Sequence, residues 1–124
     1  MNAEQIGKQL VALCREGKNL ECINTLLSPD VVSVEAAAPP GGDRTSRGLE
    51  AIRAKHHWWS DNHTIHKAEV FGPYPHGDDR FAVRFVYDIT NKPSGKRLTM
   101  DEVALYTVAN DKVTKEEFFY STGG

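Results

Sequence analysis

The chain has 124 residues, of which 40% are hydrophobic and 26% are charged, and its formal net charge is −2 at pH 7. This length suits a single domain, residues 1–124, with one hydrophobic core. The near-neutral charge and the scattered Lys and Arg argue against nucleic-acid binding, and no apolar run is long enough to cross a bilayer.

The N-terminal part of the chain is predicted to form two helices. Ile6, Leu10 and Leu13 recur at helical spacing within residues 3–16, and a second, shorter helix is predicted over residues 20–27. Both cysteines of the sequence fall in these helices, where we expect small buried thiols rather than a disulfide. The segment lacks the charged-then-apolar order of a signal peptide, so we expect a cytoplasmic protein.

A short strand and a long loop follow these helices. Residues 31–35 are rich in valine and are predicted to form the strand, whereas residues 36–48 are rich in Pro, Gly and charge and are predicted to form the loop. Glu35 ends the strand. We expect it to be a solvated acid, with a pocket-facing position as the alternative.

The third helix is predicted over residues 49–62. Ile52, His56 and Trp59 are spaced by four and three residues, so they share one face, and Trp58 lies on the flank of that face. His56 can therefore point toward the interior. It could carry protons there, and the alternative is a half-buried histidine bonded to backbone.

The rest of the chain is predicted to form four antiparallel strands. They are expected over residues 64–71 and 80–90, followed by the two strands of a hairpin within residues 96–120, with a loop at residues 74–79. Helices come first and strands last, an order that predicts an α+β fold with the helices packed on one face of a curved sheet.

One carboxylate interrupts an otherwise apolar row in the final hairpin. Glu102 alternates with apolar residues on the same strand face: Leu98, Met100, Ala104, Tyr106 and Val108. Burial among such neighbours raises the pKa of a carboxyl group, which suits a general acid or base. The alternatives are a solvated acid at a pocket mouth and a structural hydrogen bond to Tyr87 or Tyr120.

The pairing of the strands decides which residues accompany Glu102. A three-residue loop would pair Val108 with Lys112, and therefore Glu102 with Phe118, while the preceding turn would pair Glu102 with Phe85. A one-residue slip of the last strand is the alternative register. In the preferred register the following residues share the inner face: Phe85, Tyr87, Met100, Glu102, Tyr106, Phe118 and Tyr120.

These patterns define a candidate site. Glu102 is the candidate acid or base, and His56 is its candidate helper. Six aromatic residues are the candidate ligand-binding set, with core packing as the alternative for each: Trp59, Phe85, Tyr87, Tyr106, Phe118 and Tyr120. His56 and His63 are seven residues apart, but no further ligand lies nearby, so no metal is expected.

The other face of the hairpin is also partly apolar. Val103, Leu105 and Phe119 would form a surface with too much apolar area to remain in contact with water. A homodimer through this outer face is therefore expected.

Three stretches of the sequence resemble the nuclear transport factor 2-like superfamily, and within it the SnoaL-like domains. They read LLSPDVVSVE, RGLEAIRAKHHWW and VANDKVTKEEFFY, and the resemblance extends over nearly the whole chain. It implies a cone-shaped, cystatin-like fold in which three N-terminal helices pack on a strongly curved, mainly antiparallel sheet and enclose a pocket. Members include isomerases, polyketide cyclases, hydrolases, dehydratases and binding or scaffold domains, and most are dimers.

The ketosteroid isomerases of this superfamily need groups that the matching positions lack. The general base would fall at Ala36, and the two groups of the oxyanion hole would fall near Val11 and Ala104. Steroid isomerisation is therefore not expected. The acids and the arginine that the hydrolases require have counterparts only on the predicted outer face.

Two functions remain open from the sequence. In the first, the chain binds a small apolar molecule and catalyses an isomerisation, cyclisation, dehydration or hydrolysis by proton transfer, without a cofactor. In the second, it is a non-catalytic dimeric interaction or scaffold module. Neither function calls for a nucleic acid or a membrane as partner.

Overall fold

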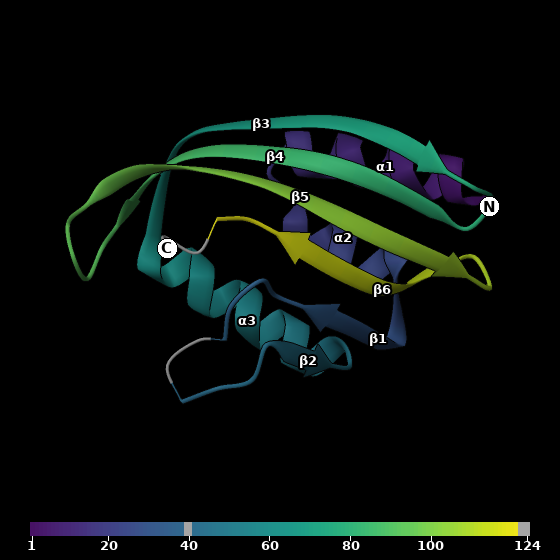
Figure 1. Ribbon diagram of the computed structural model, residues 1–124, viewed down its shortest axis with the longest axis horizontal. Coiled ribbons are helices and arrows are strands. Elements are labelled where there is room, and N and C mark those ends of the chain that lie inside the picture. The colour runs from purple at the N-terminus through teal and green to yellow at the C-terminus, as the bar shows by residue number, and fades with distance from the viewer. Residues whose placement is uncertain (39–40, 122–124) are drawn as a thin grey trace.

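The computed structural model describes residues 1–38 and 41–121 (Figure 1). Three helices lie against one face of a curved six-stranded sheet. The helices are α1 (Ala3–Arg15), α2 (Asn19–Leu26) and α3 (Leu49–Asn62). The strands are β1 (Leu27–Val34), β2 (Thr45–Arg47), β3 (His63–His76), β4 (Arg80–Asn91), β5 (Arg97–Ala109) and β6 (Lys112–Phe119). None of the helices in the described part combines the length and the apolar character needed to span a bilayer.

The sheet has the strand order β2-β1-β6-β5-β4-β3. Strand β1 runs parallel to β6, and all other neighbouring strands are antiparallel. The predicted α+β fold, with three N-terminal helices on a curved and mainly antiparallel sheet, is thereby confirmed. Strand β2 was not predicted, because only three residues of the expected loop form it by pairing with β1.

Two predicted strand boundaries are wrong. Strand β1 begins at Leu27, directly after α2, rather than at residue 31. Strand β3 continues to His76 through the predicted loop, because an irregularity between Phe71 and Tyr74 absorbs Gly72 and Pro73 and pairing with β4 then resumes. A local bulge thus lets a strand pass residues that usually end one.

The last hairpin differs from its predicted register. Asn110 and Asp111 both have positive φ, 52° and 64°, and form a two-residue turn that pairs Ala109 with Lys112. An irregularity next to Val108 then shifts the register further. As a result Phe118 lies opposite Ala104 rather than opposite Glu102. The shift amounts to two residues, so the predicted faces of both strands are preserved.

The core lies between the helices and the inner face of the sheet. Helix α1 contributes Ile6 and Leu10 to it, and β4 contributes Phe81 and Val83, all of which are buried. Both cysteines are buried and free, as expected. This packing fixes the inner face of β4, β5 and β6, on which the candidate residues stand.

Candidate functional site

Glu102 is half-buried on the inner face of β5, directly opposite Phe85 of β4. The predicted pairing between these two residues is confirmed. Burial raises the pKa of its carboxyl from 4.5 to about 7, and the nearby carboxylate of Glu35 adds to the shift while Lys55 opposes it. At neutral pH this carboxyl is therefore close to its midpoint, where a group both donates and accepts protons readily.

Lys55 connects α3 to β1 above the sheet. Its Nζ donates hydrogen bonds to the Ser33 hydroxyl at 2.6 Å and to Oε1 of Glu35 at 2.8 Å, and it lies 5.2 Å from the centroid of the Phe118 ring. The side chains of Lys55 and Glu35 are 28% and 23% exposed, so water screens this ion pair only in part. Glu35 is thus not the solvated strand-end acid that the sequence suggested.

Tyr120 follows β6 and reaches the same carboxylate. Its hydroxyl donates a hydrogen bond to Oε2 of Glu35 at 3.1 Å. Burial raises the pKa of this hydroxyl, and the neighbouring Glu35 raises it further. Both oxygens of Glu35 are consequently held by protein donors, one from Lys55 and one from Tyr120.

A second buried acid lies deeper in the same region. Glu116 of β6 is only 7% exposed and stands beside Ser33 in the parallel pairing of β1 with β6. Burial raises the pKa of its carboxyl, whereas Lys55 and a hydrogen bond with Ser33 lower it. We define the acid–lysine cluster as Glu35, Lys55, Glu102 and Glu116.

A shallow pocket of about 360 Å³ opens next to this cluster. The residues that line it belong to the start of β5 and to the segment after β6: Leu98, Thr99, Met100, Asp101, Tyr120 and Ser121. Met100 shares the strand face of Glu102, and Tyr120 holds Glu35. None of the four cluster residues is in the lining of this pocket, and the hydrogen bond from Tyr120 to Glu35 connects the two.

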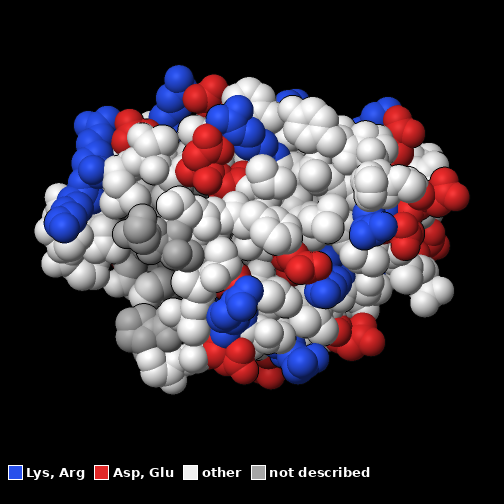
Figure 2. All heavy atoms as spheres, in the orientation of Figure 1, with Lys and Arg blue, Asp and Glu red and all other residues white. Residues whose placement is uncertain are grey.

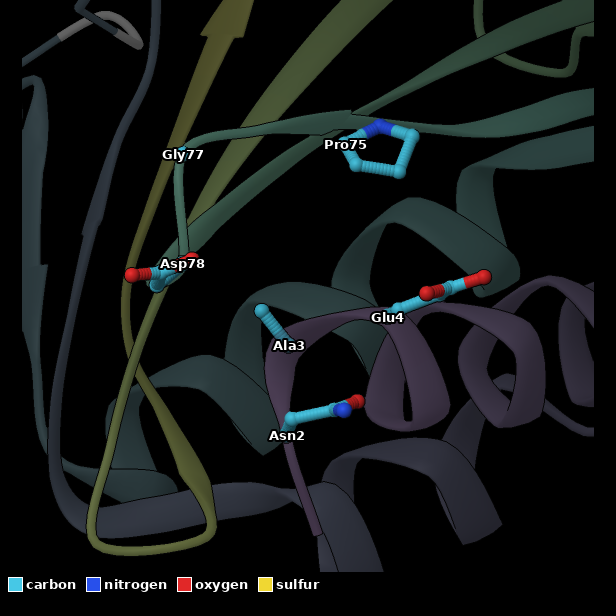
Figure 3. Close-up of a pocket in the computed structure, with 6 residues that line it drawn as sticks. All are labelled: Asn2, Ala3, Glu4, Pro75, Gly77 and Asp78. Atoms are coloured by element: carbon cyan, nitrogen blue, oxygen red, sulfur yellow. The ribbon is translucent and has the colours of Figure 1, made fainter.

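A further pocket of about 260 Å³ lies elsewhere in the molecule (Figure 3). The start of α1 and the β3–β4 turn line it, with Ala3 and Glu4 facing Pro75 and Asp78. None of the predicted site residues belongs to its lining.

Four of the six predicted aromatic residues fall into two groups. Phe85 and Tyr87 stack with their ring centroids 6.0 Å apart, and Trp59 lies 5.8 Å from Tyr87, so these three residues form one cluster. Tyr106 is 4% exposed and stacks on Phe81 at 5.0 Å inside the core. Burial raises the pKa of the Tyr87 and Tyr106 hydroxyls well above the ordinary value.

His56 is half-buried on α3, and the centroids of the His56 and His57 rings are 5.7 Å apart. Burial, followed by the charge of His57, lowers the pKa of His56. Within residues 1–38 and 41–121 no hydrogen bond joins His56 to Glu102, so its role as a helper stays a prediction. His63 uses its ring nitrogens for the Trp59 carbonyl and the Asn91 amide.

The outer face of the sheet carries the residues predicted for it. Phe119 and Val103 lie opposite each other on β6 and β5 and are 53% and 40% exposed. Arg84 and Asp101 form a two-pronged ion pair on the solvent side, at 2.7 and 3.0 Å. They are therefore not available to the inner face.

Sequence reasoning missed two members of the acid–lysine cluster. Lys55 lies three residues after Ile52 and four before Trp59, a spacing that places it on the inward face of α3. Glu116 alternates with Phe118 and Tyr120, so the pattern of β6 could have revealed it. The helical spacing of Lys55 and the strand alternation of Glu116 are both visible in the sequence, but the apolar residues beside them give the stronger pattern.

The face of the molecule seen in Figure 2 carries charges of both signs. Figure 2 shows Lys and Arg interspersed with Asp and Glu on the visible face, with uncharged residues between them. No single sign dominates that face.

The three helices on a curved sheet define an α+β cone of the nuclear transport factor 2-like type. An NTF2-like protein from Burkholderia thailandensis superposes with a TM-score of 0.81 at 16% identity, covering 98% of this chain and 92% of that chain. A candidate isomerase from Bacillus subtilis gives a TM-score of 0.78 at 13% identity, covering 98% and 90%. At these identities the likeness shows the fold alone.

A sequence profile of the SnoaL-like domain matches residues 1–120, and the chain belongs to this family. A Mesorhizobium loti protein named as a candidate SnoaL-like polyketide cyclase is 43% identical over 97% of this chain and 100% of that chain, with a TM-score of 0.90. No curated protein matches the sequence. The resemblance seen in the sequence is confirmed at the level of family and fold.

Proposed function

We propose that the protein binds a small, largely apolar molecule at the inner face of the sheet and catalyses a proton transfer on it without a cofactor. Glu102 would give or take the proton. The reaction would be of the isomerase or cyclase type, because relatives of this fold carry such names. The observation that carries the proposal is a carboxyl with a pKa of about 7 on an aromatic strand face.

The surroundings of Glu102 support this role. Phe85, which is 4% exposed, and Tyr87 form apolar surroundings for it, and Tyr120, which lines the pocket, donates a hydrogen bond to Glu35. A pocket of about 360 Å³ falls at the lower end of the range for small-molecule sites. A ligand bound there would meet an apolar wall and a small number of polar groups, which is the usual composition of such sites.

The test begins with a thermal-shift screen of apolar ketones, aldehydes and esters, because a ligand selective for the folded state raises the melting temperature. Compounds that bind are then incubated in D2O, and NMR follows deuterium uptake at the carbon next to the carbonyl. We expect uptake with the native protein and only the buffer rate with Glu102→Gln, while Glu50→Gln, an exposed change on α3, has no effect. Uptake unchanged by Glu102→Gln would contradict the proposal.

A second candidate function rests on the outer face of the sheet. There Phe119 and Val103 expose an apolar surface that is more typical of an interface than of a free surface. We propose that two copies pair through this face, as a non-catalytic interaction module would require. In this function the acid–lysine cluster would be dispensable.

Light scattering tests the pairing. Phe119→Lys is expected to convert a dimer to a monomer, because it places like charges opposite each other across a two-fold interface. Ile65→Lys is the matched control, since Ile65 is 49% exposed and lies on β3, away from β6. A native protein that is monomeric at micromolar concentration would contradict the pairing.

A further inference from the structure

Lys55 is the cation whose charge lowers the pKa of Glu102, and the protein itself accepts hydrogen bonds from two of its donors. Its ammonium group has three N–H donors. Ser33 accepts one at 2.6 Å, Glu35 accepts one at 2.8 Å, and the Phe118 ring lies 5.2 Å away. The charge of Lys55 thus acts on carboxyls of the protein: Glu35 accepts a hydrogen bond from it, and it lowers the pKa of Glu102 and of Glu116.

Glu102 is in the opposite situation. Among the residues that the structure describes, no side chain or backbone group makes a hydrogen bond with its carboxyl. Its oxygens are nevertheless open to solvent, because no fully buried and unpartnered side-chain oxygen occurs in the described residues. Glu102 is therefore the member of the acid–lysine cluster with hydrogen-bonding capacity to offer a ligand.

The groups around Glu102 determine which charge a ligand can carry. Glu35, which follows β1, and Glu116 from β6 are carboxyls, Lys55 from α3 is the cation, and Tyr87 from β4 carries a hydroxyl. Three carboxyls thus share one lysine. An additional negative charge would meet repulsion that no free cation offsets, whereas an uncharged ligand would not.

We propose that the site accepts an uncharged ligand whose acceptor oxygen, a carbonyl or an ether, takes a hydrogen bond from protonated Glu102, and that it excludes anions. The inference rests on the proposed function and adds the charge of the ligand and the protonation state that binds it. Lys55 is then a positioning residue, which holds Glu35 and does not contact the ligand.

Acetophenone and benzoate are suitable probes, because they share a ring and a similar size but differ in charge. Titrations of ¹⁵N-labelled protein would follow the amide signals of Met100, Glu102 and Tyr120 at pH 6 and pH 8. We expect acetophenone to bind at pH 6 at least ten times more tightly than benzoate. Its affinity should fall about tenfold by pH 8, because only the protonated fraction of Glu102 is competent.

Two variants separate the hydrogen bond from simple packing. Glu102→Gln keeps a donor at every pH, so acetophenone should still bind and its affinity should lose the pH dependence. Glu102→Leu removes the donor and should weaken binding at pH 6 to the level of the native protein at pH 8 or below. The Gln variant also guards against a loss of binding caused by misfolding in the Leu variant.

Three outcomes would overturn the inference. Benzoate binding as tightly as acetophenone at these residues would show that the site accepts anions. If Glu102→Gln also weakened the binding of benzoate, the ligand site at Glu102 would stand, and only the exclusion of anions would be wrong. Acetophenone affinity that is independent of pH in the native protein, or the absence of any shift at these residues, would show that protonated Glu102 does not bind such an oxygen.

Discussion

Glu102→Gln is expected to make the protein more stable by about 3 kcal/mol at pH 8 and by less than about 1 kcal/mol at pH 5. In the native protein the carboxyl has a pKa of about 7, against 4.5 in its ordinary state. The folded state holds this proton more tightly than the unfolded state. Folding therefore costs little extra below pH 4.5, the cost grows as the pH rises from 4.5 to 7, and it levels off above pH 7.

Glutamine has a similar shape and no charge, so it removes this cost. Urea unfolding at pH 5, 6.5 and 8 measures the difference between the variant and the native protein, which cancels contributions from other groups such as His56. Glu50→Gln, an exposed change on α3, should give curves parallel to those of the native protein. A variant that is equally or less stable at pH 8 would contradict the assigned surroundings of Glu102.

Lys55→Met is expected to destabilise the protein by about 2–4 kcal/mol at pH 8 and by clearly less at pH 5. The change removes the one cation from among Glu35, Glu102 and Glu116, and these carboxyls then repel one another without an offset. The Ser33 hydroxyl also loses its partner. Burial raises the pKa of Glu102 and of Glu116, so these two carboxyls take up protons as the pH falls and the repulsion declines.

Lys8→Met is the matched control for this change. Lys8 forms an exposed pair with Glu4 on α1, at 3.2 Å, and such surface pairs contribute at most about 1 kcal/mol. Adding Glu102→Gln to Lys55→Met should recover part of the lost stability at pH 8, because the two groups interact. An effect of Lys55→Met that is equal at pH 5 and pH 8 would mean that packing, and not charge, explains the loss.

Much of the inner face could be predicted from the sequence. The turn between β4 and β5 fixed the pairing of Phe85 with Glu102, and the period of two placed Phe118 and Tyr120 on the same side as Glu102. The hairpin at Asn110 was harder to predict, because two non-glycine residues adopt positive φ there and a bulge follows. Such residues rarely adopt this conformation, so composition favoured a longer loop.

The acid–lysine cluster was harder to predict than the fold. Lys55 and Glu116 follow the helical and strand periods, but polar residues at such positions are usually assigned to solvent. Only the tertiary structure shows that Lys55 spans from α3 to β1 and brings Ser33 and Glu35 together. Glu35 looked like a solvated strand end, because the sequence alone does not show that α3 covers it.

Glu102 is expected to change its protonation near neutral pH within the acid–lysine cluster. The most direct test is a ¹³C NMR titration of the glutamate carboxyl signals, with Glu102 assigned by its absence in Glu102→Gln. The structure predicts a midpoint at about pH 7, moving higher in Lys55→Met because the opposing cation is gone. A midpoint near 4.5, unchanged by Lys55→Met, would contradict both the burial of this acid and its proposed role in proton transfer.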